Sequence, residues 1–139
     1  MSSDEMRVTG SARIVVSAAM AAMGMCALTA GGWWAIRTGS VDLGKGAGLV
    51  LAVSSVIAVG AAAGIVSGRY GAAAISWAVG LIGALAVQEA GYLLDPSWPR
   101  GETGFAGSVL YAAVFLLPLL GSGHILGVWA RNAGGGLFA

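Results

Sequence analysis

Four long apolar stretches, separated by short polar segments, dominate the pattern of this chain. Each is long enough, at about 1.5 Å per residue, to cross a hydrocarbon core of roughly 30 Å. We therefore expect an all-α integral membrane protein, a four-helix bundle forming one domain over residues 1–139. The stretches predict transmembrane helices at about 14–36, 46–67, 72–94 and 107–129.

The connecting segments carry charges and turn-forming residues, and they suggest how the helices follow one another. The segment 67–71 is very short, so we expect the second and third helices to be antiparallel neighbours and the closest pair. The whole bundle should then have an antiparallel up-down topology, with both termini on the same side. The glycine-rich tail, 132–139, is expected to be flexible.

Small residues repeat at a spacing of four in the second and third stretches. Residues four apart lie on one face of a helix, and small side chains there allow two helices to approach closely. We expect these two faces to pack against each other. They consist of Gly60, Gly64 and Gly68 in the second stretch and Ser76, Gly80 and Ala84 in the third.

Pro118 lies near the middle of the fourth stretch. A proline inside a helix removes one backbone donor, and its ring displaces the carbonyl four residues earlier, here that of Val114. We therefore expect a kink at this position.

Composition supports a membrane protein. The chain is 58% hydrophobic and 9% charged, whereas soluble domains carry about 25% charged residues. A net charge of +1 provides no field for nucleic acid. The one cysteine, Cys26, excludes an intramolecular disulfide and a cysteine-based metal site. Lipid is thus the expected solvent for most of the chain.

The basic residues favour one orientation in the membrane. The side expected to bear both termini has four of them and the opposite side has three, which places the termini in the cytoplasm. Arginine outnumbers lysine six to one, a composition typical of GC-rich bacteria, so we expect a multi-pass protein of the bacterial cytoplasmic (inner) membrane. The two sets are Arg7, Arg13, Arg69 and Arg131 against Arg37, Lys45 and Arg100.

Glu89 is the one charged residue within the four predicted spans. A carboxylate in a bilayer is a candidate functional group because its burial is costly. It could form an ion or ligand site with the neighbouring Gln88. Alternatively, Glu89 lies close enough to the outer interface to reach water, or to pair with Arg37 or Arg100.

His124, the one histidine, falls in the fourth predicted helix. Its near-neutral unperturbed pKa would suit a proton relay or ligand site. The alternative is a hydrogen bond between helices. Under the expected topology His124 and Glu89 lie near opposite faces of the membrane, so we do not expect them to form an acid–base pair.

Enzyme chemistry finds little support. The chain has no G-x-S-x-G, no HExxH and no dithiol, and a lone histidine is a poor start for a metal site. We expect no enzyme activity, no cofactor and no metal. The hypothesis is a non-enzymatic assembly, accessory or scaffold component that packs in the lipid bilayer as a homo-oligomer or in a larger complex. The alternative is a small transporter or channel for protons, cations or a small solute, using Glu89.

Overall fold

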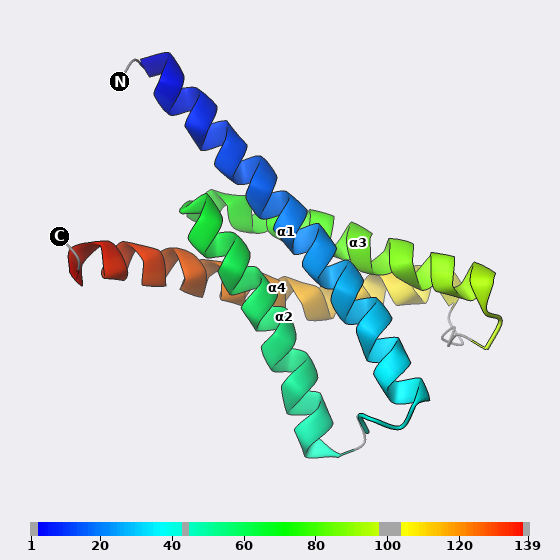
Figure 1. Cartoon of the computed structure of the whole chain (residues 1–139). Coiled ribbons are helices and arrows are strands. Elements are labelled where there is room, and N and C mark those ends of the chain that lie inside the picture. The colour runs from blue at the N-terminus through cyan, green and yellow to red at the C-terminus, as the bar shows by residue number, and fades with distance from the viewer. Residues whose placement is uncertain (1–2, 43–44, 98–103, 138–139) are drawn as a thin grey trace.

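The structure, a computed structural model, describes residues 3–42, 45–97 and 104–137 (Figure 1). The regular elements within these ranges are all helical. They are α1 (Ser3–Arg37), α2 (Gly46–Ser67), a short 3₁₀ helix η1 (Tyr70–Ala72), α3 (Ala73–Leu94) and α4 (Gly104–Leu137).

The ends of α2 and α3 follow from local chemistry. Gly68 ends α2 with φ +63° and donates its backbone N–H to the carbonyl oxygen of Gly64 at 2.9 Å. Glycine adopts this left-handed conformation readily because it has no Cβ. Asp95 ends α3 in an extended conformation, as a residue before proline prefers. The predicted ranges of these two helices agree with the observed bounds to within about one residue.

α1 is longer than the apolar pattern predicted. It begins at Ser3 rather than near residue 14. The residues before the first predicted span therefore continue the same helix, whose apolar membrane-length segment is Thr9–Arg37.

α4 also extends beyond its predicted end and continues to Leu137. The flexible tail expected from residue 132 is thus corrected to helix as far as 137, and residues 138–139 lie outside the described part. Arg131 supplies a physical reason, because its guanidinium donates to the carbonyl oxygens of Ile65 and Val66 at 3.0 and 3.1 Å. These bonds fix α4 to the end of α2.

Within the described residues, four helical segments are long and apolar enough to cross a membrane. All four helices also expose large aliphatic side chains on their outer faces. Such surfaces are unfavourable in water and suit lipid, where the helical backbone satisfies its own hydrogen bonds. These features indicate a membrane-embedded protein. The segments are Thr9–Arg37, Gly46–Ser67, Tyr70–Leu94 and Gly104–Gly134.

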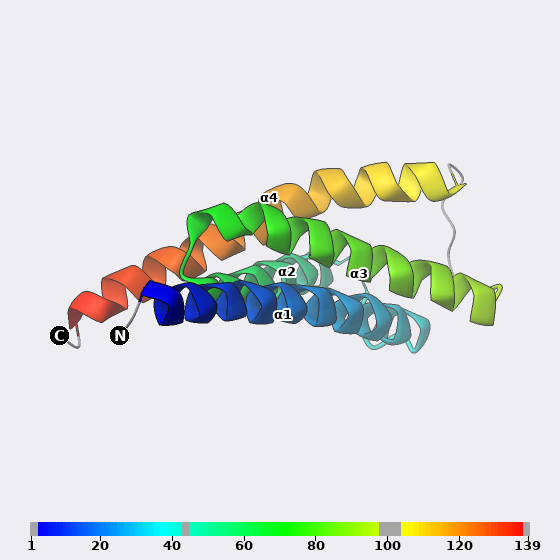
Figure 2. The ribbon, with the colours of Figure 1, turned by 90° about the horizontal axis from the view of Figure 1, so that it is seen from above.

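The helices form two layers. α1 and α2 lie in one layer and α3 and α4 in the other (Figures 1 and 2). Between the layers, α2 packs mainly against α4 and α1 mainly against α3, whereas α2 and α3 have little contact. The expectation that the second and third helices form the closest pair is therefore wrong. Gly68, in the left-handed conformation, and η1 connect α2 in one layer to α3 in the other. The short connection therefore joins two helices that have little contact with each other.

Glycines on α2 explain how closely it approaches α4. A Cβ added at Gly60 would overlap the backbone carbonyl oxygen of Leu120, and one added at Gly64 would overlap that of His124. The backbones of the two helices therefore meet where α2 has no side chains.

α4 contributes glycines to the same contact. A Cβ at Gly123 would overlap the carbonyl oxygen of Ile57, and one at Gly127 would overlap that of Ala61. Gly123 and Gly127 are four residues apart, like Gly60 and Gly64 on α2. The partner of the α2 face is thus a matching face of α4.

The small-residue face of α3 packs against both α1 and α4, which corrects its predicted pairing with α2. A Cβ at Gly83 would lie 2.7 Å from the carbonyl oxygen of Ala22 of α1. One at Gly80 would lie 2.6 Å from Cδ2 of Leu120 of α4 and 3.2 Å from Cγ of Met25 of α1. Cys26 adds a hydrogen bond, in which its Sγ donates to the carbonyl oxygen of Gly83 at 3.4 Å. In the α1–α3 contact, as in the α2–α4 contact, a glycine therefore lies against the backbone of the other helix.

A small apolar core lies between the two layers. Met25 of α1 and Leu116 and Leu120 of α4 are buried there, and Ala84 of α3 packs against them. Pro118 lies inside α4 between these two leucines in the sequence. Figure 2 shows that α4 changes direction near its middle.

Candidate functional site

His124 lies where three helices meet and is fully buried, with 0% of its surface exposed. It belongs to α4, beside the end of α2 and the start of α3. A buried imidazole needs hydrogen-bond partners, because leaving its nitrogens without them costs free energy.

Both ring nitrogens of His124 have partners. Nε2 lies 3.1 Å from Oγ of Ser67 and 3.1 Å from the carbonyl oxygen of Arg69, and Nδ1 lies 3.0 Å from Oγ of Ser76. Because a carbonyl oxygen only accepts, Nε2 donates a hydrogen to the Arg69 carbonyl, while Nδ1 and the Ser76 hydroxyl share a second hydrogen bond. We call these four residues the His124 cluster.

The buried hydroxyls around this cluster are also satisfied. Ser67 Oγ donates to the carbonyl oxygen of Gly64 at 3.2 Å and accepts from the backbone N–H of Arg69 at 3.3 Å. Ser17 of α1 donates to the carbonyl oxygen of Ala63 at 2.7 Å. Polar groups thus tie all four helices together inside an otherwise apolar molecule.

The His124 cluster is suited to hold helices together. Its ring contacts two serine hydroxyls and a backbone carbonyl, which belong to α2, α3 and the connection between them. Such interhelical hydrogen bonds are a common form of packing between helices in membranes. The interhelical bond that the sequence offered as one alternative is therefore present in the structure.

Gln88 and Glu89, the other candidate site residues, lie far from His124. They are half-buried on α3, more than three turns beyond Ser76, which corresponds to a rise of about 20 Å for Glu89. Arg37, a possible partner for Glu89, pairs with Asp95, while Arg100 lies outside the described residues. The structure does not bring these candidates together, and a transport role for Glu89 stays a prediction.

Asp95 joins the ends of α1 and α3. Its carboxylate accepts hydrogen bonds from the hydroxyl and the backbone N–H of Ser97, at 2.7 and 3.0 Å, and forms an ion pair with Arg37. Donation by Ser97, aided by the Arg37 charge, holds the pKa of Asp95 below its ordinary value of 3.8.

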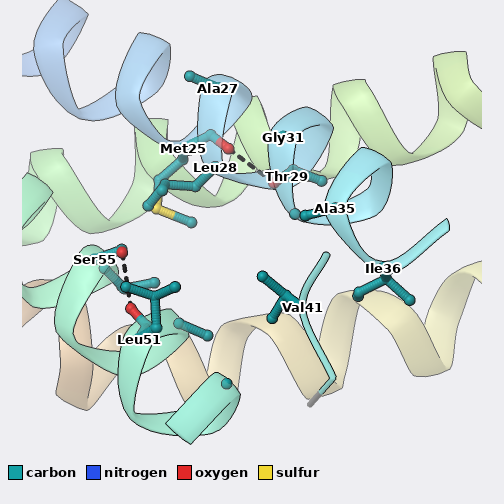
Figure 3. Close-up of a pocket in the computed structure, with 14 residues that line it drawn as sticks. Met25, Ala27, Leu28, Thr29, Gly31, Ala35, Ile36, Val41, Leu51 and Ser55 are labelled. Atoms are coloured by element: carbon teal, nitrogen blue, oxygen red, sulfur yellow. Dashed lines mark hydrogen bonds between the residues drawn. The ribbon is translucent and has the colours of Figure 1, made fainter. Parts of the chain in front are cut away.

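An apolar groove of about 390 Å³ separates the second half of α1 from the first half of α2. Figure 3 shows Met25 and Leu28 on the α1 side and Leu51 and Ser55 on the α2 side, with Val41 of the connecting loop at one end. The serine hydroxyl donates within its own helix, to the carbonyl oxygen of Leu51 at 2.8 Å. The groove therefore presents mainly carbon atoms.

Small residues line the α1 side of this groove. Ala27, Gly31 and Ala35 repeat at a spacing of four, and a Cβ added at Gly31 or Gly32 would meet nothing within 4 Å. We call the set of Ala27, Gly31 and Ala35 the α1 ridge. Sequence reasoning missed it, although the same spacing that drew attention to Gly60 and Gly64 was present.

Among the described residues, no three His, Cys, Asp or Glu side chains gather in an arrangement that could hold a metal ion. Cys26 is a reduced, partly buried thiol that contacts a backbone carbonyl. The candidate sites are therefore the His124 cluster, the apolar groove with its α1 ridge, and the charged end of the molecule near Arg69.

No family model, curated protein or solved structure matches the chain.

Proposed function

We propose that this chain is a non-enzymatic membrane protein that assembles with a second copy of itself through the groove between α1 and α2. The observation that supports this proposal is the α1 ridge, which borders the groove and has open space beside Gly31. Lipid tails are as apolar as leucine, so hydrophobicity alone does not drive helices together in a bilayer. Small residues favour association because they allow backbones to approach.

The use of glycine elsewhere in the chain supports the same conclusion. Gly60, Gly64, Gly123 and Gly127 each lie against the backbone of another helix. A glycine inside a helix costs about 1 kcal/mol relative to alanine, and close packing offsets that cost. At Gly31 no part of the described chain provides such a contact. A second copy, related by a two-fold axis, would provide it by placing one α1 ridge on the other.

We also propose that the four helices cross the membrane up and down, with both termini on the cytoplasmic side of a bacterial inner membrane. The excess of basic residues expected on that side supports this orientation. In Figures 1 and 2 the start of α1 and the end of α4 lie at the same end of the molecule, as such a topology requires.

Cysteine crosslinking in vesicles tests the proposed dimer. In a Cys26→Ala background, Gly31→Cys should form a disulfide-linked dimer under mild oxidation, because the proposed contact places the two α1 ridges backbone to backbone. Gly121→Cys is the matched control, since Gly121 is also a helical glycine with no neighbour within 4 Å of an added Cβ. It should remain monomeric under the same conditions.

A second variant measures the energy of the contact. Gly31→Leu should weaken association in vesicles by roughly tenfold, and Gly121→Leu should leave it unchanged. Energy transfer between labelled copies, followed as the protein is diluted with lipid, provides the dissociation constant. Equal crosslinking at both glycines, or a wild-type chain that remains monomeric at every dilution, would show that the groove does not mediate self-association.

A further inference from the structure

A second cavity, also of about 390 Å³, lies at the end of the molecule where α1 begins and α2 ends. Arginines from three separate segments line it: Arg13 of α1, Arg69 of the α2–α3 connection and Arg131 of α4. Thr9 and Ser67 add hydroxyl groups to its wall. We call this cavity the cationic pocket.

The described lining of the cationic pocket contains no acidic residue. The ion pairs among the described residues involve Arg37 and Lys45, not the three arginines of the pocket. Three guanidinium groups around one cavity repel each other, and an anion between them would relieve that repulsion. The side chains of Asp4 and Glu5, about a turn or more before Thr9, lie outside the described part.

Two glycines make room for these guanidinium groups. A Cβ at Gly68 would overlap the guanidinium of Arg131, and a Cβ at Gly10 would lie 2.9 Å from Nη2 of Arg69. Arg131 is further held by its bonds to the carbonyl oxygens that end α2. The guanidinium of Arg131 is therefore held in place by the fold, which reduces the entropy that a ligand would have to overcome there.

The chemistry and the location of the pocket indicate its ligand. Guanidinium groups bind phosphate through paired N–H donors. Arg13 immediately precedes the first apolar stretch, and Arg69 follows α2 directly. In a membrane both residues would lie at the depth of lipid phosphates.

We propose that Arg13, Arg69 and Arg131 bind a phosphate group at the headgroup level of the membrane. The phosphate belongs to an anionic phospholipid or to a small soluble phosphate compound, which present the same group to the pocket. This inference is independent of the proposed dimer, since the groove and the cationic pocket involve opposite halves of α1.

Lipid titration followed by native mass spectrometry tests the proposal. The detergent-solubilised full chain should bind phosphatidylglycerol more tightly than zwitterionic phosphatidylcholine. The double variant Arg13→Gln/Arg69→Gln should lose about tenfold in affinity for phosphatidylglycerol, because each guanidinium contributes charged hydrogen bonds. Arg37→Gln is the matched control, as Arg37 is paired with Asp95 away from the pocket, and it should bind like the wild type.

Calorimetric titration with inorganic phosphate distinguishes the two sources. Phosphate binding that depends on Arg13 and Arg69, without selective lipid binding, would support the site and assign it to a soluble phosphate. Asp4→Asn/Glu5→Gln should bind the same anion at least as tightly as the wild type. If the double arginine variant fails to fold, Arg13→Gln alone should still lose about threefold. If binding of both probes is unchanged by the arginine variants, the proposal is wrong.

Discussion

At the scale of single residues, His124 shows how one polar side chain can define a helix junction. Its two ring nitrogens face hydroxyls from α2 and α3, and its own helix is α4. Ser67 and Ser76 would lose a partner if the ring were absent. A buried hydrogen bond costs more to break than it contributes when formed, because the remaining polar group stays desolvated.

We therefore expect His124→Phe to destabilise the protein by about 2 kcal/mol or more, since a somewhat larger apolar ring replaces the imidazole and its hydrogen bonds to Ser67, Ser76 and the Arg69 carbonyl are lost. Thermal or denaturant unfolding in detergent measures the change. Ser122→Ala is the control on the same helix, because the exposed Ser122 hydroxyl bonds only within α4. It should alter stability by less than about 0.5 kcal/mol. Equal losses of stability in the two variants would show that the hydrogen bonds of His124 do not stabilise the helix junction.

Asp95 leads to a prediction about pH. Its pKa is lowered in the folded protein, so its carboxylate contributes stability above the ordinary value of 3.8, and this contribution is lost as pH falls through the lower folded value. The thermal midpoint of the wild type should exceed that of Asp95→Asn at pH 7. The difference should shrink below about pH 4. A difference that stays constant over this range would contradict the assigned cause.

At the scale of helices, the α2–α4 contact depends on glycines that oppose the partner backbone. Gly64→Ala should destabilise the protein by about 1–3 kcal/mol, because the new methyl group would overlap the carbonyl of His124. Gly121→Ala, on an open face of α4, should be neutral or stabilise by up to about 1 kcal/mol through helix propensity. Unfolding of the two variants side by side checks the prediction, and a Gly64→Ala as stable as Gly121→Ala would contradict it.

The helices themselves could be predicted from the sequence, but their partners could not. Uninterrupted apolar length located four helices, and the bounds of α2 and α3 were close because Gly68 and Pro96 end them sharply. The predicted pairing of α2 with α3 was wrong because a short connection can join two helices that lie in different layers. Its length alone does not determine which helices pack against each other. A second pair of glycines at spacing four, Gly123 and Gly127, was present in the fourth stretch. This pair would have predicted that α2 packs against α4.

The candidate sites were harder to predict, because each depends on residues distant in sequence. His124 was noticed as a lone polar residue, but its serine partners lie 57 and 48 positions away. The arginines were counted for orientation, and nothing in their spacing indicated a shared cavity. Only the packing of α1 and α4 against α2 brings Arg13, Arg69 and Arg131 together.

At the scale of the whole molecule, the two layers leave different surfaces at the two ends of the α1–α2 pair. One end has an apolar groove bordered by small residues, which suits a second helix. The other end has the cationic pocket, which suits a phosphate. Both proposals require that the four helices cross a bilayer, so the topology is the claim on which the account depends.

Sidedness labelling of single cysteines tests that claim most directly. In a Cys26→Ala background, cysteines at Thr38, Gly71, Ser97 and Asn132 mark the segments that follow α1, α2, α3 and the last predicted span. A membrane-impermeant maleimide added to intact cells should label Thr38→Cys and Ser97→Cys, and should reach Gly71→Cys and Asn132→Cys only after permeabilisation. Labelling of Thr38→Cys and Gly71→Cys from the same side, or recovery of the folded protein without detergent, would contradict a chain of four spans.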